Sequence, residues 1–252
     1  MRIWMLPNYT QIFFMKPLFF VLVSLIYFNA AAQDKVIMND KNVVLRDLGE
    51  FKGINIKGPF KVYYSQSAKH AVGVSASTES ARDKITTRVS AGILNIELDG
   101  ASMSWWGKNP EFKVYISSPE IKNIHASGAV NFLITDLIKS EDLTLKFTGA
   151  SDFYGKLDCG SLTLSFTGAS DIEIMGSADR VVADLTGASK LSGASFKVGD
   201  AELKATGAST IKLGVSGALG ANATGASSIT YYGSPKSLST RASGASSVKK
   251  GN

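Results

Sequence analysis

The chain has 252 residues, of which 44% are hydrophobic, and a formal net charge of +6. Its only dense basic cluster is Lys249-Lys250, without the interleaved aromatic residues of a phosphate-binding surface, so the composition argues against a nucleic-acid partner. Cys159 is the only cysteine and cannot form an internal disulfide, so we expect it to be a small buried apolar residue.

The first 32 residues predict a signal peptide. They contain Arg2 and Lys16 but no acidic residue, then an apolar run over residues 17–28 and small residues at 29–32. This apolar run is shorter than the ~20 residues that cross a bilayer. We therefore expect cleavage, no stable membrane insertion afterwards, and a single exported domain over residues 33–252. Since no cysteine follows the cleavage point, we expect a periplasmic or cell-surface protein without a lipid anchor.

A tetrapeptide close to Thr-Gly-Ala-Ser recurs along the second half of the chain. Its glycines lie 18 to 21 residues apart, at Gly128, Gly149, Gly168, Gly187, Gly207, Gly225 and Gly244. This spacing is too short for a helix pair and fits one turn of a β-solenoid. We predict an all-β fold, a parallel β-helix with regular coils of about 19 residues over residues 126–252.

Residues at the same distance from the glycine of each copy are of similar type, so the aligned copies form columns. The position six residues earlier is apolar in every strong copy, as Leu143, Leu162, Val181, Ala201, Leu219 and Leu238. The position four residues later is apolar too, as Phe153, Ile172, Leu191, Ile211, Ile229 and Val248. Polar residues alternate with apolar neighbours between these columns, which is typical of a strand with one buried face. We expect both columns to fill the core.

The tetrapeptide itself fits a corner between strands. Glycine allows a positive φ there without steric cost, and we interpret these seven glycines as structural corners. We expect the alanine to point inward, and the serine or threonine beside it to bond to neighbouring backbone.

Residues 33–125 lack the tetrapeptide, although they are also strand-like. Alternating segments occur at residues 54–56, 61–64, 72–74, 93–96 and 113–116, and no helical stretch competes with them. These strands form either irregular early coils or a cap over the open end of the stack.

The chain resembles a known family, the putative auto-transporter adhesins with a head GIN domain, which Bacteroidetes-type bacteria export. The resemblance rests on residues 51–62, FKGINIKGPFKV, on the Gly-Ala-Ser series, and on Tyr-Gly-Ser-Pro at residues 232–235. It implies a right-handed, single-stranded β-helix and an adhesin-like function.

Asp152 and Asp171 follow the tetrapeptide in successive copies and should lie about 5 Å apart on adjacent strands. Such a pair could serve a polysaccharide lyase or hydrolase. Because no Arg, His or further acid accompanies it in the pattern, we favour a solvated edge and no catalysis. His70 and His125 lie far apart and away from other ligand types, so we expect neither a metal site nor a cofactor.

Four aromatic residues are candidates for binding: Trp105 and Trp106 in a loop rich in Gly, Asn and Pro, and Tyr231 and Tyr232 near the end of the chain. They could stack on sugar rings or anchor a protein, or they could fill the side or end of the solenoid. We predict a monomeric, non-enzymatic adhesin-like protein of the cell envelope that contacts a surface polysaccharide or protein. A polysaccharide-active enzyme and a purely structural periplasmic protein remain the alternatives.

Overall fold

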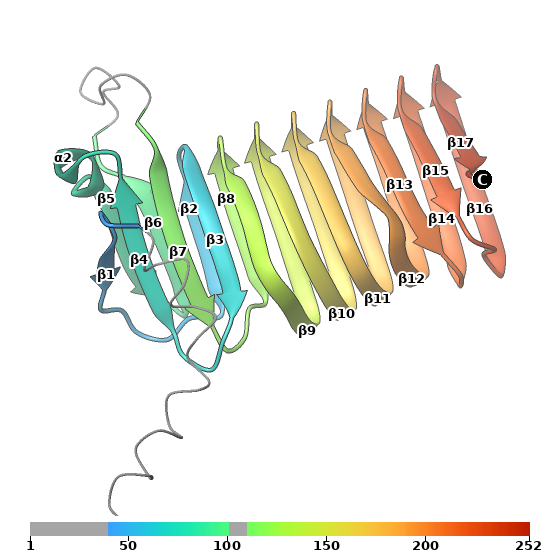
Figure 1. The fold of residues 1–252 in the computed structure, drawn as a ribbon. Helices are drawn as coiled ribbons and strands as arrows, with labels where there is room; N and C mark the ends of the chain where they lie inside the picture. Colours follow the sequence, from blue (N-terminus) through green and yellow to red (C-terminus); the bar gives the residue numbers. More distant parts are fainter. Residues whose placement is uncertain (1–39, 101–109) are drawn as a thin grey trace, which may run out of the picture.

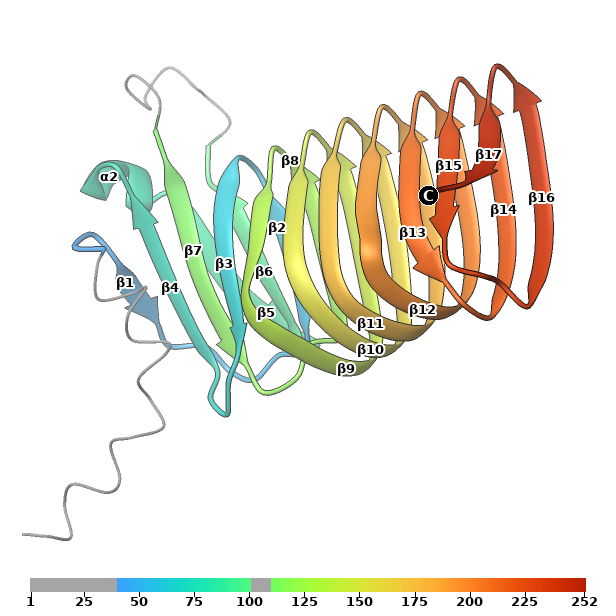
Figure 2. The same ribbon diagram turned by 45° about the vertical axis from the view of Figure 1, so that its right-hand side comes forward.

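The computed structural model describes residues 40–100 and 110–252, which form one long stack of strands (Figure 1). Each coil runs along one side of the stack, turns a corner and returns along a second side (Figure 2). The predicted all-β solenoid is confirmed, while its right-handedness stays a prediction. The described residues contain no helix long and apolar enough to cross a membrane.

The first side carries β1 (Val44–Arg46), β4 (Ala71–Ala76), β7 (Phe112–Ser118), β3 (Phe60–Gln66), β13 (Thr210–Val215), β15 (Ser228–Tyr232) and β17 (Ser247–Lys250). The second side carries β5 (Ile85–Ser90), β6 (Ile93–Leu98), β2 (Gly53–Lys57), β8 (Asn123–Gly128), β14 (Ala218–Gly225) and β16 (Ser237–Gly244). Four long strands bend through both sides: β9 (Asn131–Gly149), β10 (Asp152–Gly168), β11 (Asp171–Gly187) and β12 (Lys190–Gly207).

The coils stack in the register that the glycine spacing predicts. Each corner glycine pairs with the next, from Gly128 opposite Gly149 to Gly225 opposite Gly244. The apolar columns line up in the same way and form a continuous core. Near its middle, Phe147 stacks on Phe166 with ring centroids 4.9 Å apart. Identical positions thus repeat along the axis, so each coil contacts chiefly its two neighbours.

All seven corner glycines have positive φ, between 76° and 122°. They also lie so close together that side chains do not fit, because a Cβ on Gly128 would come 2.9 Å from the carbonyl oxygen of Gly58. Gly58 is therefore one more member of this column, with φ of 131°. Both the backbone conformation and the close approach of successive coils require glycine here.

The expectation that the alanine of the tetrapeptide points inward is wrong. Ala150 is exposed, whereas Ser151 is buried, and the later copies as far as Ser227 repeat this arrangement. A serine is accommodated inside because its hydroxyl finds carbonyl acceptors at the corner. The Ser209 hydroxyl donates to the carbonyl oxygen of Gly187 over 3.2 Å, and that oxygen also accepts from the backbone N–H of Ala208.

The N-terminal part combines parallel coils with antiparallel strands. The β2–β3 coil lies between β6–β7 on one side and β8–β9 on the other, although residues 67–122 separate it from β8 in sequence (Figures 1 and 2). At this end of the stack, β4 pairs antiparallel with β7, β5 pairs antiparallel with β6, and β1 pairs antiparallel with β4. A single helical turn, α2 (Glu79–Arg82), lies there, so the expectation of strands alone is wrong at this point.

The two apolar columns are buried in every coil except the last. Leu238 of β16 is 50% exposed, and Val248 of β17 is only partly buried. Among the residues that the structure describes, each of these strands has a paired strand on one edge only, β14 and β15 respectively. The expectation that all column residues fill the core is therefore wrong for Leu238, because no strand of the described residues covers it on the side away from β14.

Candidate functional site

A row of residues at one register position runs along the first side, one from each successive strand. In register order it comprises Leu45, Gly73, Tyr115, Tyr63, Leu133, Tyr154, Glu173, Ser192, Lys212, Thr230 and Lys249. The row is apolar or aromatic as far as Tyr154 and polar beyond it. We call Leu45, Tyr115, Tyr63, Leu133 and Tyr154 the tyrosine row.

Apart from the buried Tyr115, the residues of the tyrosine row lie at the surface, because their chain neighbours fill the core. Phe132 and Ile134 on either side of Leu133 are buried, as is Phe153 beside Tyr154. By the alternation of a strand, Leu133 and Tyr154 point away from the core. Both are partly exposed. An apolar row on an open sheet face is a feature of interaction surfaces.

One end of the row is held rigidly. The Tyr115 hydroxyl donates to Asp40 Oδ2 over 2.8 Å, and the Tyr115 ring stacks on Tyr63 with centroids 5.2 Å apart. Lys61 Nζ lies 5.7 Å from the Tyr63 ring centroid, within cation–π range. Burial and then the bond to Asp40 raise the pKa of Tyr115 well above its ordinary value. The buried Tyr115 thus fixes the position of Tyr63.

The predicted carboxylate pair lies beside the other end of the row. Asp152 is directly opposite Asp171 in the register of β10 and β11, and Tyr154 is opposite Glu173. Desolvation raises the pKa of the Tyr154 phenol above its ordinary value, and the negative charges of the three carboxylates raise it further. The two carboxylates therefore lie at the surface, beside the Tyr154 ring, where the row changes from aromatic to polar residues.

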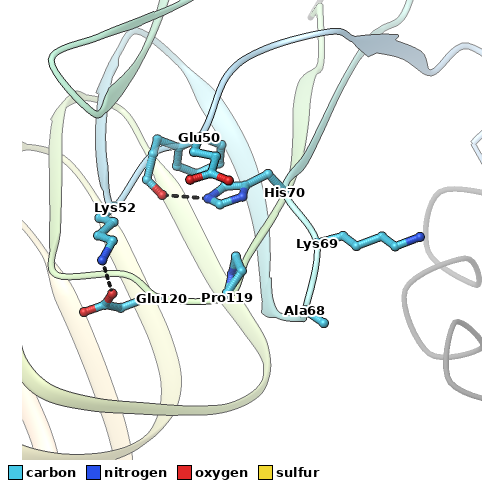
Figure 3. Close-up of a pocket in the computed structure, with 8 residues that line it drawn as sticks. Glu50, Lys52, Ala68, Lys69, His70, Pro119 and Glu120 are labelled. Carbon is cyan, nitrogen blue, oxygen red and sulfur yellow. Dashed lines mark hydrogen bonds and ion pairs between the residues drawn. The ribbon is translucent and has the colours of Figure 1, made fainter.

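A separate hollow of about 520 Å³ surrounds His70 near the capped end (Figure 3). His70 Nε2 lies 2.9 Å from the carbonyl oxygen of Phe51, and its ring contacts the Phe51 ring edge-on. Across the hollow, Lys52 Nζ and Glu120 Oε2 form an ion pair of 2.6 Å. The imidazole, Lys52 and Glu120 thus have protein partners, and Glu50 and Lys69 also line the hollow.

Tyr231 and Tyr232 have different environments. Tyr231 is partly buried and packs against the core. Tyr232 lines a shallow hollow of about 420 Å³ together with Phe196 and Gly214. This hollow lies where the register of β12 against β13 shifts, between Gly193 and Lys197. Trp105 and Trp106 lie outside the described residues.

The remaining candidates behave as ordinary structural residues. Cys159 is buried, and burial raises the pKa of its thiol to about 12. His125 lies on β8, where partial burial and then the charge of Lys146 lower its pKa. Over the described ranges, no three His, Cys, Asp or Glu side chains are grouped as a metal site requires.

Sequence reasoning missed the tyrosine row, although one signal could have revealed part of it. Phe-Lys-Val-Tyr occurs twice, at residues 60–63 and 112–115, and the two copies pair residue by residue in β3 and β7. A repeated tetrapeptide of this kind indicates stacked strands. No repeated tetrapeptide includes Leu133 or Tyr154. These residues line up with Tyr63 only because β3 lies between β7 and β9.

Comparison with solved structures agrees on the fold. A putative adhesin from Bacteroides fragilis aligns with a TM-score of 0.74 and 20% identity, covering 84% of this chain and 98% of that one. A putative lipid binding protein from Parabacteroides distasonis aligns with a TM-score of 0.65 and 21% identity over 84% and 98%. A putative adhesin from Parabacteroides merdae gives 0.62 and 16% over 83% and 95%.

At these identities the likeness concerns the fold alone. No curated protein matches the sequence. A family model does match, that of the putative auto-transporter adhesin, head GIN domain, over residues 50–235. This range begins just before the β2–β3 coil and runs through the glycine corners to the turn after Tyr232, so it includes most of the stack. The chain therefore belongs to the head GIN domain family of putative auto-transporter adhesins.

Proposed function

We propose that this protein is an exported, non-catalytic, adhesin-like protein that contacts a polysaccharide or protein of a cell surface through the first side of its solenoid. The tyrosine row carries this proposal, since an apolar row on an open, rigid sheet face is suited to contact with another molecule. Membership in an adhesin family supports it. The solenoid adds stiffness, because each coil is bonded to its neighbours along its whole length.

The proposal extends to processing and location. We propose that residues 1–32 are removed on export and that residues 33–252 act as one monomeric domain in the periplasm or at the cell surface, without a lipid anchor. Fractionation of the producing cells tests this directly. Recovery of the protein only in the cytoplasm would contradict it.

Binding to isolated envelope fragments tests the contact function. The purified mature protein should sediment with envelope fragments, and a double variant, Tyr63→Ala/Tyr154→Ala, should sediment less while it remains folded. Equal sedimentation of the two proteins would show that the first side is not the contact surface.

One observation favours a second candidate, a polysaccharide lyase or hydrolase. Asp152 and Asp171 lie side by side in register, at the separation that strand spacing sets. Incubation with a panel of acidic and neutral polysaccharides decides between the two functions. Turnover that is lost in Asp152→Asn/Asp171→Asn would establish an enzyme, whereas we expect no turnover by the unmodified protein.

A further inference from the structure

We propose that the tyrosine row binds a neutral glycan chain, which lies along the axis of the stack across β3, β9 and β10. This inference rests on the contact function proposed above and names its ligand. Tyr63, Leu133 and Tyr154 would contact the apolar C–H faces of successive sugar units. The polar side chains beside the row would bind the sugar hydroxyls.

The spacing of the row suits a chain of rings. Tyr63, Leu133 and Tyr154 occupy one register position on three neighbouring strands. Because adjacent strands lie about 4.8 Å apart, the two tyrosines are separated by roughly 10 Å. An extended oligosaccharide could therefore touch both tyrosines while an intervening unit rests on Leu133.

Tyr63 and Tyr154 differ in the contacts that their rings make within the protein. One face of Tyr63 packs on Tyr115, and Lys61 lies near the ring. Tyr154 has no ring partner in the part of the chain that the structure describes. We therefore assign the main stacking contact to Tyr154 and a positioning contact to the rigidly held Tyr63. Aromatic side chains combine apolar area with little conformational entropy, which favours such contacts.

Polar side chains line the row on both sides. Lys61, Asn131 and Asp152 occupy the adjacent outward register, two residues before the row, and Lys156 follows Tyr154 on its other side. In the described chain the side chains of Asn131 and Asp152 have no hydrogen-bond partner. The ammonium groups donate, the carboxylate accepts and the amide does both. Sugar hydroxyls, which donate and accept, fit this mixture.

The balance of charge selects a neutral chain. Lys61 lies two strands from Asp152 in the same register position, and Lys156 lies two residues beyond Tyr154 on the same strand, so both signs occur along the row. A strongly acidic or basic polymer would meet repulsion from one sign wherever it met attraction from the other. A neutral polyhydroxylated ligand meets no such repulsion, so it matches the row better than a charged polymer does.

The test uses the purified mature protein on an array of neutral, acidic and amino-substituted glycans, with four variants. Tyr154→Ala should weaken binding to neutral glycans about tenfold, the loss of one good aromatic contact. Tyr154→Phe should retain most of the binding, because the ring remains. Lys212→Ala is the matched control, because Lys212 is an exposed residue at the same register position on β13. The Lys212→Ala variant should bind neutral glycans normally. Asp152→Asn shows whether the carboxylate accepts from the ligand, in which case binding should weaken.

Envelope fragments separate the failure of this inference from the failure of the contact function. Periodate, which cleaves sugar diols, should abolish sedimentation with the fragments, while protease treatment of the fragments should not. The reverse result would overturn the glycan ligand and leave a protein contact. Binding to acidic glycans alone, or binding that Tyr154→Ala and Lys212→Ala weaken equally, would also overturn the inference. No binding to any array glycan or fragment would overturn the contact function itself.

Discussion

Gly168 differs from alanine by one methyl group, which the corner cannot accept. Its φ is 122°, a conformation that side chains rarely adopt, and a Cβ would collide with the carbonyl oxygen of Gly149 in the preceding coil. We expect Gly168→Ala to lower the free energy of unfolding by about 3 kcal/mol, measured by chemical denaturation. Gly49→Ala is the control, because a Cβ there meets nothing within 4 Å. Equal effects of the two changes would contradict the steric explanation.

Asp40 links the pH dependence of stability to the tyrosine row. Burial raises the pKa of its carboxyl group, but hydrogen bonds from Tyr115, Asn42 and Ser75 outweigh this, so the pKa is lowered overall. A lowered folded-state pKa means that the stabilisation is present above the unfolded value of about 3.9 and is lost as the pH falls through the folded value. We expect Asp40→Asn to be less stable than the unmodified protein at neutral pH, with a smaller difference in strong acid. Thermal melting between pH 2 and about 7 measures this, and a difference that grows in acid would refute it.

At the scale of the element, two leucines of the same column differ strongly in the exposed fraction of their side chains. Leu219 on β14 is 2% exposed and Leu238 on β16 is 50% exposed, although the two residues pair directly. We expect Leu219→Ala to cost about 2–5 kcal/mol of unfolding free energy through transfer and cavity terms. Leu238→Ala should cost under about 1 kcal/mol, since water already reaches that side chain. Comparable losses in denaturant melts would mean that β16 is covered in solution.

The elements also show what the sequence could and could not predict. The coil register followed from the glycine spacing, because identical residues must stack when each coil repeats the last. The inward serine was missed, since the pattern does not reveal that carbonyl groups at a corner can accept from a buried hydroxyl. The tyrosine row was missed for a different reason. Its register depends on β3 lying between β7 and β9, a long-range arrangement that local alternation does not encode.

The whole molecule behaves as a one-dimensional stack with two unlike ends. The strands at one end, β1, β4 and β5, pair antiparallel, whereas β16 and β17 at the other end pair parallel and, in the described residues, each has one free edge. The exposed basic residues Arg241 and Lys249 lie on that free edge. Charged side chains on an edge strand oppose pairing with a second identical edge. This arrangement is consistent with the proposed monomer.

Nearest-neighbour stacking predicts that one coil can be removed from the middle of the protein. Ser161–Gly168 and Arg180–Gly187 pair at a constant offset of 19 residues, so deletion of residues 165–183 joins Leu164 to Asp184 with the inward and outward positions unchanged. We expect a folded, shorter solenoid of lower stability, because the sum of interface energies loses one coil. Circular dichroism and denaturant melts measure both properties.

Deletion of residues 166–183 is the matched control, since it removes one residue fewer. It would turn Asp184 toward the core and Leu185 toward water, because a one-residue shift exchanges the two faces of a strand. We expect this variant to lose cooperative unfolding, whereas the 19-residue deletion keeps it. If both variants folded equally well, the corner and not the register would determine how coils align. The stack would then tolerate coils of any length, and the regular spacing of its glycines would need another cause.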